Sequence, residues 1–505
     1  MTVDQEVCAL AIVGTGTMGR GIAQIAVTAG LEVRLFDSRP GAAEEARAFV
    51  TAMLGRLVEK GKMPTETAAA ANSRMRVAGS LADLAPADVV VEAIVEDLEI
   101  KRALFRNLEN VFADTVLATN TSSLSVTAIA AGCRRPERIA GFHFFNPVPL
   151  IKLVEVIGGG LTDAAVLDLL VALARRIGHQ PVRAADTPGF LVNHAGRGYG
   201  TEALRILGEG IAQPVDIDRI LREAAGFRMG PFELLDLTAL DVSHPAMESI
   251  YEQYYHEPRY RPSPITRVRL AAGLVGKKVG RGFYAYIDGH QVVPEGAPAP
   301  ASRPASVWIG DSDAASRVAL ATLVRAAKVT LEDAPRPSAA ALCLVAPLGE
   351  DATAAALAQG LDPTRTLAVD TFLGLDRRRT LMTTPVTAPV LIAAAHGLLA
   401  DDGTAVTIIH DSPGFVAQRV LAGIVNIACD IAQQRIATPA DIDRAVTLGL
   451  GYPQGPLAWG DALGPGRVLT ILETLQRLYG DPRYRPSPWL RRRAALGVSL
   501  LTPEN

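Results

Sequence analysis

The chain has 505 residues, of which 49% are hydrophobic and 20% are charged, and its formal net charge is −3. That length exceeds what one hydrophobic core supports, so we expect two to four domains, and the balanced charge, with no long block of one sign, argues against a nucleic-acid partner. No apolar run reaches the ~18 residues that span a bilayer, and no signal peptide is recognisable, so we expect a cytoplasmic protein with no membrane partner. The four cysteines are far apart and suit neither a disulfide framework nor a zinc site, so we expect no metal.

The first elements are a strand, a tight turn, a helix and a second strand. The apolar run 7–13 ends in GTGTMG, a helical stretch covers 20–30, and LEVRLFD at 31–37 is the next strand. Glycines at the spacing GxGxxG allow a tight turn, a close approach of the backbone to a pyrophosphate, and close packing of helix on strand. We expect them to bind a dinucleotide at the helix N-terminus, the alternative being a purely structural turn. They are Gly14, Gly16 and Gly19.

The end of the second strand indicates which dinucleotide binds. Asp37 lies 18 residues after Gly19, where a carboxylate accepts hydrogen bonds from a ribose 2′-OH and repels a 2′-phosphate. Arg39 is two residues further on and would favour a phosphate, although a solvated surface arginine explains it as well. The sequence therefore predicts NAD as the cofactor.

Two further short apolar runs, 87–94 and 115–120, alternate with helical segments and predict a parallel sheet covered on both faces. TNTSSL follows the second run, at the strand end where open α/β sheets bind ligands. Asn120 and Ser122 in this segment are candidates to reach the substrate or the nicotinamide. The alternative is that they cap the loop.

The stretch GFHFFNPVPLIKLVEV at 141–156 carries the candidate chemistry. His143 lies among aromatic residues, and Glu155 follows twelve residues later within a strand-like run. Each alone has an ordinary structural explanation, as a core histidine or an edge-strand charge. Together they predict a histidine that takes the proton of a hydroxyl group, with a carboxylate that fixes the other ring nitrogen.

The second half of the chain repeats part of the first. DTPGFLVNH at 186–194 recurs as DSPGFVAQR at 411–419, and MGPFELLD at 229–236 recurs as QGPLAWGD, both at an offset of 225 residues. PRYRPSP recurs verbatim. We therefore predict a duplicated helical domain whose two copies pack together as in a fused dimer. The predicted domains are 1–185 (Rossmann-type α/β), 186–285 (all-α), 286–306 (linker), 307–410 (degenerate α/β) and 411–505 (second all-α copy).

The segment 307–410 alternates short apolar runs with helical stretches, as the first domain does, but it lacks that domain's candidate functional residues. LAVDTF at 367–372 is predicted to take the place of the TNTSSL strand, and LMTTPVTAPV at 381–390 the place of the His143 strand. Neither contains a histidine, and no GxGxxG opens the segment. The segment reads as a decayed dinucleotide fold, with an unrelated small α/β insert as the alternative. Because Gln418 replaces Asn193 in the second copy, we predict one active site, built from residues 1–285.

Taken together, the motifs resemble the L-3-hydroxyacyl-CoA dehydrogenase family, in its longer bacterial form. GTGTMGRGIA, VVVEAIVEDLEIK, TNTSSL, GFHFFNPVPLIKLVEV, DTPGFLVN and MGPFELLD match in that order over most of residues 8–285. The resemblance implies reversible, NAD-dependent oxidation of a (3S)-3-hydroxyacyl-CoA, with a short or dicarboxylic acyl group such as 3-hydroxybutyryl or 3-hydroxyadipyl. It also implies a role in β-oxidation or phenylacetate catabolism.

The resemblance assigns residues to roles. His143 is implied as the catalytic base, Glu155 as its partner, Ser122 as a hydrogen-bond partner of the substrate 3-oxygen, and Asn193 as a further substrate contact. A helical segment with Lys60 and Lys62 corresponds to the region that meets the CoA 3′-phosphate, although a solvated helix face explains these lysines equally well. Beyond the glycines, the implied NAD contacts are Met18, Asp37, Glu96, Lys101 and Asn146.

Two other functions stay open at this stage. One is a dehydrogenase of free 3-hydroxy acids, and the other is a nonenzymatic NAD-binding scaffold. An acyl-CoA substrate and possible homo-oligomers are the expected partners. A dicarboxylic substrate needs a cation for its distal carboxylate, and Arg197, Arg205 and Arg228 lie in or near the helical domain.

Overall fold

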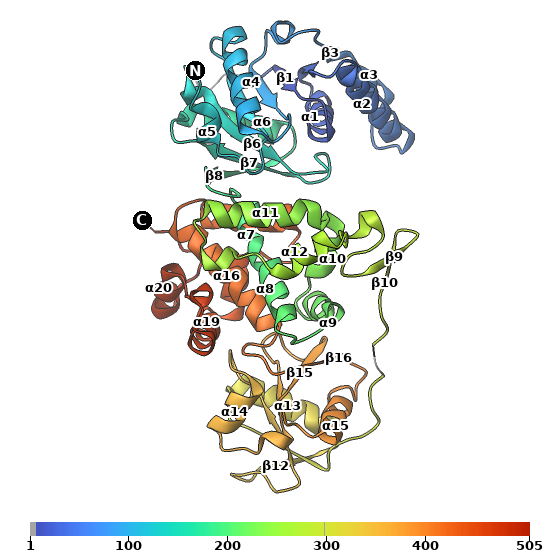
Figure 1. Cartoon of the computed structure of the whole chain (residues 1–505), viewed down its shortest axis with the longest axis vertical. Coiled ribbons are helices and arrows are strands. Elements are labelled where there is room, and N and C mark those ends of the chain that lie inside the picture. Colours follow the sequence, from blue (N-terminus) through green and yellow to red (C-terminus); the bar gives the residue numbers. More distant parts are fainter. Residues whose placement is uncertain (1–6, 297, 505) are drawn as a thin grey trace. The chain divides into compact units, whose positions relative to one another are not determined.

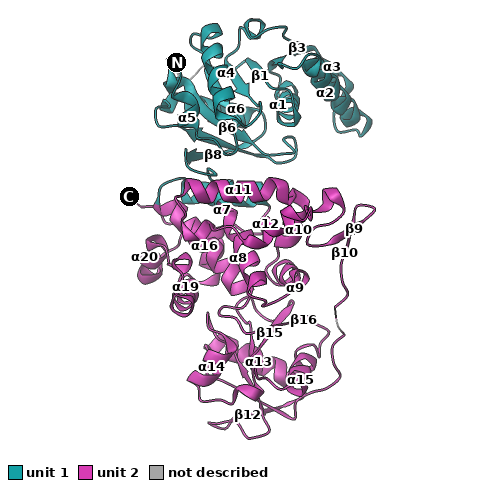
Figure 2. Cartoon of the chain, viewed as in Figure 1, with its two compact units in different colours: residues 1–194, 434–450 teal, residues 195–433, 451–505 magenta. Residues whose placement is uncertain are grey.

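The computed structural model describes residues 7–296 and 298–504. The chain divides into two compact units (Figure 2). Unit 1 comprises residues 1–194 and 434–450, and unit 2 comprises residues 195–433 and 451–505. The predicted fold class is confirmed: a Rossmann-type sheet is followed by helices, a smaller α/β sheet and a second set of helices (Figure 1).

Unit 1 is built on an eight-stranded sheet in the order β3-β2-β1-β4-β5-β6-β7-β8. The order changes direction between β1 and β4, which makes the switch point where such sheets bind ligands. All neighbours run parallel except β6 and β7, which are antiparallel. The strands are β1 (Ala9–Val13), β2 (Glu32–Phe36), β3 (Met75–Val77), β4 (Val89–Glu92), β5 (Val116–Thr119), β6 (Ile139–Phe144), β7 (Leu153–Gly158) and β8 (Gln180–Ala185).

Helices cover this sheet (Figure 1), and successive residues of a strand point to opposite faces of a sheet. One core joins Leu10 and Ile12 of β1 to Ile22 of α1, Val50 of α2 and Leu170 of α6, all of them buried. The amphipathic helix α4 begins where the Asp97 side chain accepts a hydrogen bond from the Ile100 amide at 2.9 Å. The helices are α1 (Thr17–Thr28), α2 (Ala42–Glu59), α3 (Thr65–Ser73), α4 (Leu98–Val111), α5 (Val126–Ala130), α6 (Ala164–Arg176), α7 (Val192–Ala195) and, from the distant segment, α17 (Pro439–Ala445).

Unit 2 contains a six-stranded sheet in the order β12-β11-β13-β14-β15-β16. Only β14 and β15 are antiparallel, so the pattern at this edge repeats that of β6, β7 and β8 in unit 1. The strands are β11 (Ser306–Ile309), β12 (Thr330–Glu332), β13 (Leu342–Val345), β14 (Thr366–Val369), β15 (Arg379–Thr383) and β16 (Val406–Ile409), and the helices between them are α13 (Ala314–Ala326), α14 (Ala352–Ala358) and α15 (Pro389–Leu399).

The remaining helices of unit 2 come from both repeats. Helix α8 of the first copy packs on α16 of the second copy, and the missing side chain of Gly198 brings the helices close, because a Cβ there would lie 3.0 Å from Ile427. The helices of the first copy are α8 (Arg197–Gly208), α9 (Pro214–Arg219), α10 (Pro231–Thr238), α11 (Leu240–Gln253) and α12 (Pro264–Ala271), and those of the second are α16 (Ala417–Gln433), α18 (Pro456–Leu463), α19 (Pro465–Tyr479) and α20 (Pro488–Leu496).

The contacts between the copies are reciprocal, as expected of a twofold-related pair. The Arg259 guanidinium donates to the Arg485 carbonyl at 2.6 Å, and Arg483 donates to the Arg261 carbonyl at 3.5 Å. These residues belong to the two verbatim copies of PRYRPSP. The repeated sequence is therefore the place where each copy contacts the other.

The same reciprocity links each sheet to the opposite copy. In unit 1 the Ala185 amide at the end of β8 donates to the Ile436 carbonyl at 2.8 Å. In unit 2 the His410 amide after β16 donates to the Ile211 carbonyl at 3.0 Å. The compact units therefore cut across the predicted boundaries, since the segment 434–450 of the second helical copy packs with the first sheet.

Part of the predicted linker is ordered structure. Strands β9 (Ala285–Ile287) and β10 (His290–Val292) form an antiparallel hairpin within and beside the stretch 286–306. Its two turn residues, Asp288 and Gly289, have φ of 51° and 76°, which is the signature of a two-residue hairpin turn. Among the described residues, no helix has the length and apolarity to cross a membrane, and no group of three or more His, Cys, Asp or Glu side chains is placed to hold a metal ion.

Candidate active site

The glycine turn between β1 and α1 has three different local constraints. Gly14 has φ of 91°, and a Cβ at Gly19 would lie 1.9 Å from the Gly14 carbonyl oxygen. A Cβ at Gly16, by contrast, would meet no atom within 4 Å. Two of the glycines are thus required by the turn itself, and the third leaves open space for a ligand to approach the backbone. These residues fit a bound dinucleotide.

Asp37 stands directly after β2 and is hydrogen-bonded to this turn. Its Oδ2 accepts from the backbone amide of Thr15 at 2.8 Å and from the Thr15 hydroxyl at 2.9 Å. Burial raises the pKa of Asp37, but these bonds and the Arg39 amide outweigh it and hold the pKa below its usual value. The Arg39 guanidinium itself pairs at 2.6 Å with Glu45, and both side chains are exposed. A carboxylate that stays ionised is thus presented beside the turn.

A buried ion pair that the sequence analysis did not find underlies the next loop. Glu92, at the end of β4, is fully buried and its Oε1 lies 2.5 Å from Nζ of Lys101. Lys101 also lies 3.4 Å from Glu96. Oε1 of Glu96 accepts from the Ser122 amide at 2.8 Å and from the Ser122 hydroxyl at 3.2 Å. The network fixes the loop that follows β5.

Glu96 is held in its charged form within this network. Burial raises its pKa, but the Lys101 charge and the hydrogen bonds from Thr121, Ser122 and Ser123 together lower it by more, so that the pKa lies below the usual value. On the same loop, Oδ1 of Asn120 accepts from the Phe144 amide at 2.9 Å. The ends of β5 and β6 are therefore tied together beside His143.

His143 and Glu155 face each other across the antiparallel pair β6 and β7. Nδ1 of His143 lies 2.6 Å from Oε2 of Glu155, and the carboxylate is fully buried. An ionised carboxylate at this distance requires a proton on Nδ1, which leaves Nε2 as the acceptor. The geometry is that of an oriented base.

The other carboxylate oxygen of Glu155 is held by a segment from the end of the first domain. Oε1 accepts from the amides of Leu191 at 3.0 Å and Val192 at 2.8 Å, where α7 begins. The preceding Gly189 and Phe190 both have positive φ, 75° and 48°, so the PGF turn aims these amides at the carboxylate. The Phe190 ring lies 6.0 Å from the imidazole. The half-buried Asn193 follows Val192 on the same short helix.

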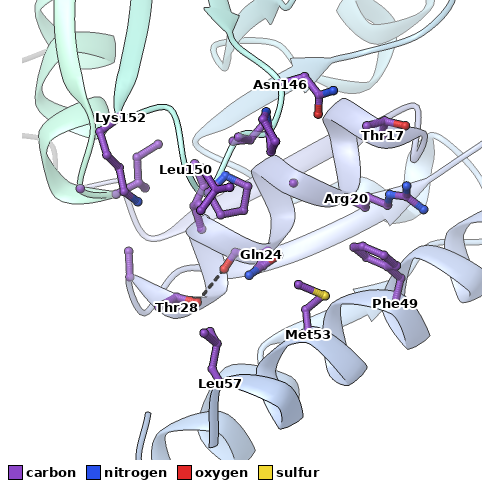
Figure 3. Close-up of a pocket in the computed structure, with 18 of the residues that line it drawn as sticks. Thr17, Arg20, Gln24, Thr28, Phe49, Met53, Leu57, Asn146, Leu150 and Lys152 are labelled. Carbon is purple, nitrogen blue, oxygen red and sulfur yellow. Dashed lines mark hydrogen bonds between the residues drawn. The ribbon is translucent and has the colours of Figure 1, made fainter. Parts of the chain in front are cut away.

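A cavity of about 660 Å³ opens between α1, α2 and the connection from β6 to β7. Figure 3 shows Phe49, Met53 and Leu57 projecting from α2 toward α1, with Leu150 and Lys152 on the connection. The lining is largely apolar, and Asn146 is one of its few polar residues. Arg20, Lys152 and Arg176 supply cations to its wall.

The remaining predicted residues lie around these features. Met18 is partly buried and packs against the core of unit 1. Lys60 directly follows the last residue of α2, Lys62 lies two residues further on, and both are exposed. Neither lysine lines the cavity, although Leu57, one turn before Lys60, does.

The second sheet lacks this site, and the predicted correspondence of its strands is wrong. Asp186 after β8 accepts from the first amides of α5, and Asp411 after β16 does the same for α14. This equivalence and the strand registers make β14 the counterpart of β6, and not of the TNTSSL strand. Short alternating apolar runs did not distinguish these neighbours. The positions of His143 and Glu155 are taken by Asp370 and Thr380.

Gln418 is used inside this second domain. Its side chain donates to Oδ1 of Asp370 at 3.0 Å and accepts from the Gly349 amide at 2.8 Å, and it is buried. Helix α13, the counterpart of α1, begins with Asp313, whose carboxylate accepts from the Ala315 and Ser316 amides. A side-chain carboxylate thus takes the place that an anionic ligand has at a helix N-terminus.

Comparison with known proteins gives matches over the whole chain. A family model described as 3-hydroxyacyl-CoA dehydrogenase, NAD binding domain, matches residues 9–187, and one described as 3-hydroxyacyl-CoA dehydrogenase, C-terminal domain, matches residues 189–286 and again 414–499. The 3-hydroxyadipyl-CoA dehydrogenase of Escherichia coli (strain K12) is 39% identical over 489 residues, which is 96% of this chain and 97% of that protein.

Shorter relatives match the first half alone. The probable 3-hydroxybutyryl-CoA dehydrogenase of Bacillus subtilis (strain 168) is 39% identical over 282 residues, which is 56% of this chain and 98% of that protein. Among solved structures, 3-hydroxybutyryl-CoA dehydrogenase from Escherichia coli K12 has a TM-score of 0.85 at 37% identity and covers 97% of this chain and 99% of that one. The second match of the C-terminal family model confirms the predicted repeat.

Proposed function

The chain belongs to the 3-hydroxyacyl-CoA dehydrogenase family and oxidises 3-hydroxyacyl-CoA with NAD, and we propose that His143 and Glu155 carry out the proton transfer. The observation that supports this is the 2.6 Å contact between Nδ1 and the buried carboxylate, which leaves Nε2 able to accept a proton. The comparisons favour this reaction over the dehydrogenation of free 3-hydroxy acids or a nonenzymatic role.

In the oxidative direction, Nε2 of His143 takes the proton of the 3-hydroxyl group. Glu155 then pairs with the resulting imidazolium, and because two backbone amides hold its other oxygen, the carboxylate keeps its position as the charge develops. NAD, when bound, supplies the hydride acceptor. In the reverse direction the imidazolium returns the proton to the 3-oxygen.

Ser122 and Asn193 are the proposed substrate contacts. The Ser122 hydroxyl, now donating to Glu96 at 3.2 Å, has a lone pair and a rotatable proton with which to bind the 3-oxygen. Asn193 follows the amides that hold Glu155, so it is positioned by the same turn. The proposed NAD contacts are Gly14, Gly16, Met18, Gly19, Asp37, Glu96, Lys101 and Asn146.

The cavity beside α2 is the proposed site for part of the CoA thioester. Its apolar walls suit a chain without charge, and the cations Arg20, Lys152 and Arg176 suit phosphates. Lys60 and Lys62, exposed at the end of α2, are proposed to meet the CoA 3′-phosphate. The relatives named for 3-hydroxyadipyl and 3-hydroxybutyryl substrates favour a short or dicarboxylic acyl group, in β-oxidation or phenylacetate catabolism in the cytoplasm.

The test uses acetoacetyl-CoA and NADH, with absorbance at 340 nm. His143→Gln is expected to abolish turnover while NADH binding, followed by fluorescence, persists. The matched control is His256→Gln, because His256 is exposed in the turn after α11 and contacts the side chains of Glu252 and Tyr251. Turnover by the His143→Gln variant at the wild-type rate would show that His143 is not the catalytic base. Turnover of the free acid as fast as the thioester would show that the enzyme does not recognise the CoA group.

A further inference from the structure

The two helices that border the cavity of about 660 Å³ present opposite surfaces to it. On α1, Arg20, Gln24 and Thr28 follow one another every four residues and therefore lie on one face of the helix. On α2 the residues at the same spacing are apolar: Phe49, Met53 and Leu57 (Figure 3). Helices that pack directly on each other bury apolar against apolar side chains. A polar face opposite an apolar face instead suits a ligand with one polar edge and one apolar surface.

Gln24 is the most deeply buried polar residue on this face of α1. It is only 7% exposed and lines the cavity. Its backbone carbonyl accepts from the Thr28 hydroxyl at 2.7 Å, but its side-chain amide has no hydrogen-bond partner among the described residues. Buried side-chain amides are normally hydrogen-bonded, and an amide offers a donor and an acceptor side by side. The cavity therefore suits a ligand with the complementary pair, one acceptor beside one donor.

Arg20 lies one helical turn before Gln24 and is held by an aromatic ring. Its guanidinium lies 4.1 Å from the centroid of the Phe49 ring, and it forms no ion pair or hydrogen bond with the described residues. Lys152 and Arg176 bring further positive charge to the lining, whereas none of the described Asp and Glu residues belongs to it. A guanidinium stacked on a ring keeps its N–H groups available to an anion. The cavity thus combines an unpaired amide with a positively charged lining.

The cavity extends from the end of β6 along the whole of α1. Asn146, three residues after His143, lines one part of it. The lining follows α1 from Thr17 to Thr28, a length of roughly 18 Å at the rise of an α-helix. A CoA thioester carries its reacting carbon at one end and its adenine nucleotide at the other. The cavity therefore has the length and the polarity to hold the nucleotide while the acyl group lies near His143.

We propose that Gln24 binds the adenine base of the CoA substrate and determines the preference for that base, with Arg20 paired to a CoA phosphate. This inference rests on the proposed function, in which the same cavity holds part of the CoA thioester. Adenine presents its 6-amino group beside the N7 acceptor, and a glutamine amide accepts from the first and donates to the second. Met53 and Leu57 then cover the face of the ring. Both polar groups of the buried amide are thereby satisfied.

The experiment compares acetoacetyl-CoA with its analogue in which hypoxanthine replaces adenine, a change that turns the 6-amino donor into an acceptor and keeps the ring size. NADH oxidation is followed by absorbance, and the ratio of the two kcat/KM values is the readout. The wild-type enzyme is expected to prefer the adenine substrate about 3- to 10-fold, the effect of one hydrogen bond. Gln24→Met, of similar length, is expected to raise KM for acetoacetyl-CoA about 10-fold and to abolish the preference. Gln180→Met is the matched control and is expected to keep the wild-type ratio, because Gln180 is exposed on β8 and does not line the cavity.

Arg20→Gln provides a second variant, at a half-buried position, if the Gln24 variant does not fold. It is expected to raise KM for acetoacetyl-CoA on the order of 10-fold but not KM for acetoacetyl-pantetheine, which has no phosphate. Equal effects on these two substrates, a wild-type enzyme without preference for adenine, or a Gln24→Met variant that keeps the preference overturns the proposal. Weaker NADH binding by Gln24→Met also overturns it, because the cavity would then belong to the cofactor. Absence of acetoacetyl-CoA turnover by the wild type would instead overturn the proposed function, so the two failures are distinct.

Discussion

Replacing Glu155 with glutamine tests the role of the carboxylate in the proton transfer without changing its size. The native carboxylate accepts three hydrogen bonds, from Nδ1 of His143 at 2.6 Å and from the amides of Leu191 and Val192 at 3.0 and 2.8 Å. A glutamine retains one acceptor oxygen. If that oxygen keeps the two amides, the side-chain NH₂ faces Nδ1 and donates to it.

That donation reverses the tautomer of His143. The proton then resides on Nε2, the nitrogen that has to accept the substrate proton, and the ion pair with the imidazolium is lost. A hydrogen bond to a charged group contributes about 1.5–3 kcal/mol, or roughly 10- to 150-fold. Tautomer reversal in a comparable His–carboxylate pair lowers kcat by about 10⁴. We therefore expect Glu155→Gln to lower kcat by ~10² to 10⁴.

The assay is NADH-dependent reduction of acetoacetyl-CoA, together with NADH binding and thermal melting. NADH affinity is expected to stay unchanged, since Glu155 lies on β7 and the glycine turn lies after β1. The melting temperature is expected to change little for glutamine. Glu155→Ala, which leaves three buried donors without an acceptor, is expected to cost about 3–5 kcal/mol of unfolding free energy. A glutamine variant with kcat within ~3-fold of wild type would refute the assigned role.

Four other substitutions test further parts of the structure. Gly16→Ala is expected to keep the melting temperature and to weaken NADH binding, because a Cβ at Gly16 meets no atom within 4 Å. Gly19→Ala is expected to unfold the turn, because a Cβ there lies 1.9 Å from a carbonyl oxygen. Calorimetry and fluorescence titration measure these effects, and equal effects of the two variants would contradict the prediction. Arg419→Met is expected to cost about 3 kcal/mol in urea denaturation, because it removes a fully buried cation that pairs with Glu202 at 2.8 Å and with Glu209 at 2.7 Å. A loss below ~1 kcal/mol would show that Arg483 and Arg205, the other cations on these carboxylates, suffice to hold them. Burial raises the pKa of Asp218 from 3.8 to about 7. Its contribution to stability is therefore fully present below pH 3.8 and is lost as the pH rises through about 7. Asp218→Asn is expected to reduce the fall in melting temperature between pH 5 and pH 8, and an unchanged fall would show that other groups cause the pH dependence.

The sequence predicted those parts of the site that depend on fixed spacing. The glycine spacing predicted the turn, because the backbone itself requires glycine at Gly14 and Gly19, and Gly16 leaves space for a ligand. The pairing of His143 with Glu155 was predicted from the chemistry of the two side chains, and the antiparallel register of β6 and β7 places them opposite each other.

Long-range partners were not predictable in the same way. The amides of Leu191 and Val192 reach Glu155 only because the PGF turn places two successive residues at positive φ, and phenylalanine at Phe190 gives no local signal of that conformation. Glu92 reads as the polar end of an apolar strand, and its pairing with Lys101 depends on how α4 packs on the sheet. The hairpin at Asp288–Gly289 did have a local signal, the Asp-Gly pair, which the surrounding Pro and Ala residues obscured.

The replacement of Asn193 by Gln418 follows from what each sheet contains. Beside β6 and β7 stands an imidazole, and the PGF turn of the first copy supplies the two amides that orient its carboxylate partner. Beside β14 and β15 the imidazole position holds Asp370, and burial raises the pKa of that carboxyl group. The longer amide of Gln418 reaches Asp370 and the Gly349 amide at once, so it satisfies two buried polar groups of this domain.

The second helical copy also contributes a packing surface to the first sheet. The segment 434–450 of the second copy closes on the first sheet, where Gly449 passes so near that a Cβ would lie 2.8 Å from Leu153 and 3.1 Å from Val192. These two residues neighbour Glu155 in the chain and in its hydrogen bonds. The second copy thus contacts residues beside Glu155, and its helical sequence matches the family's C-terminal model at residues 414–499.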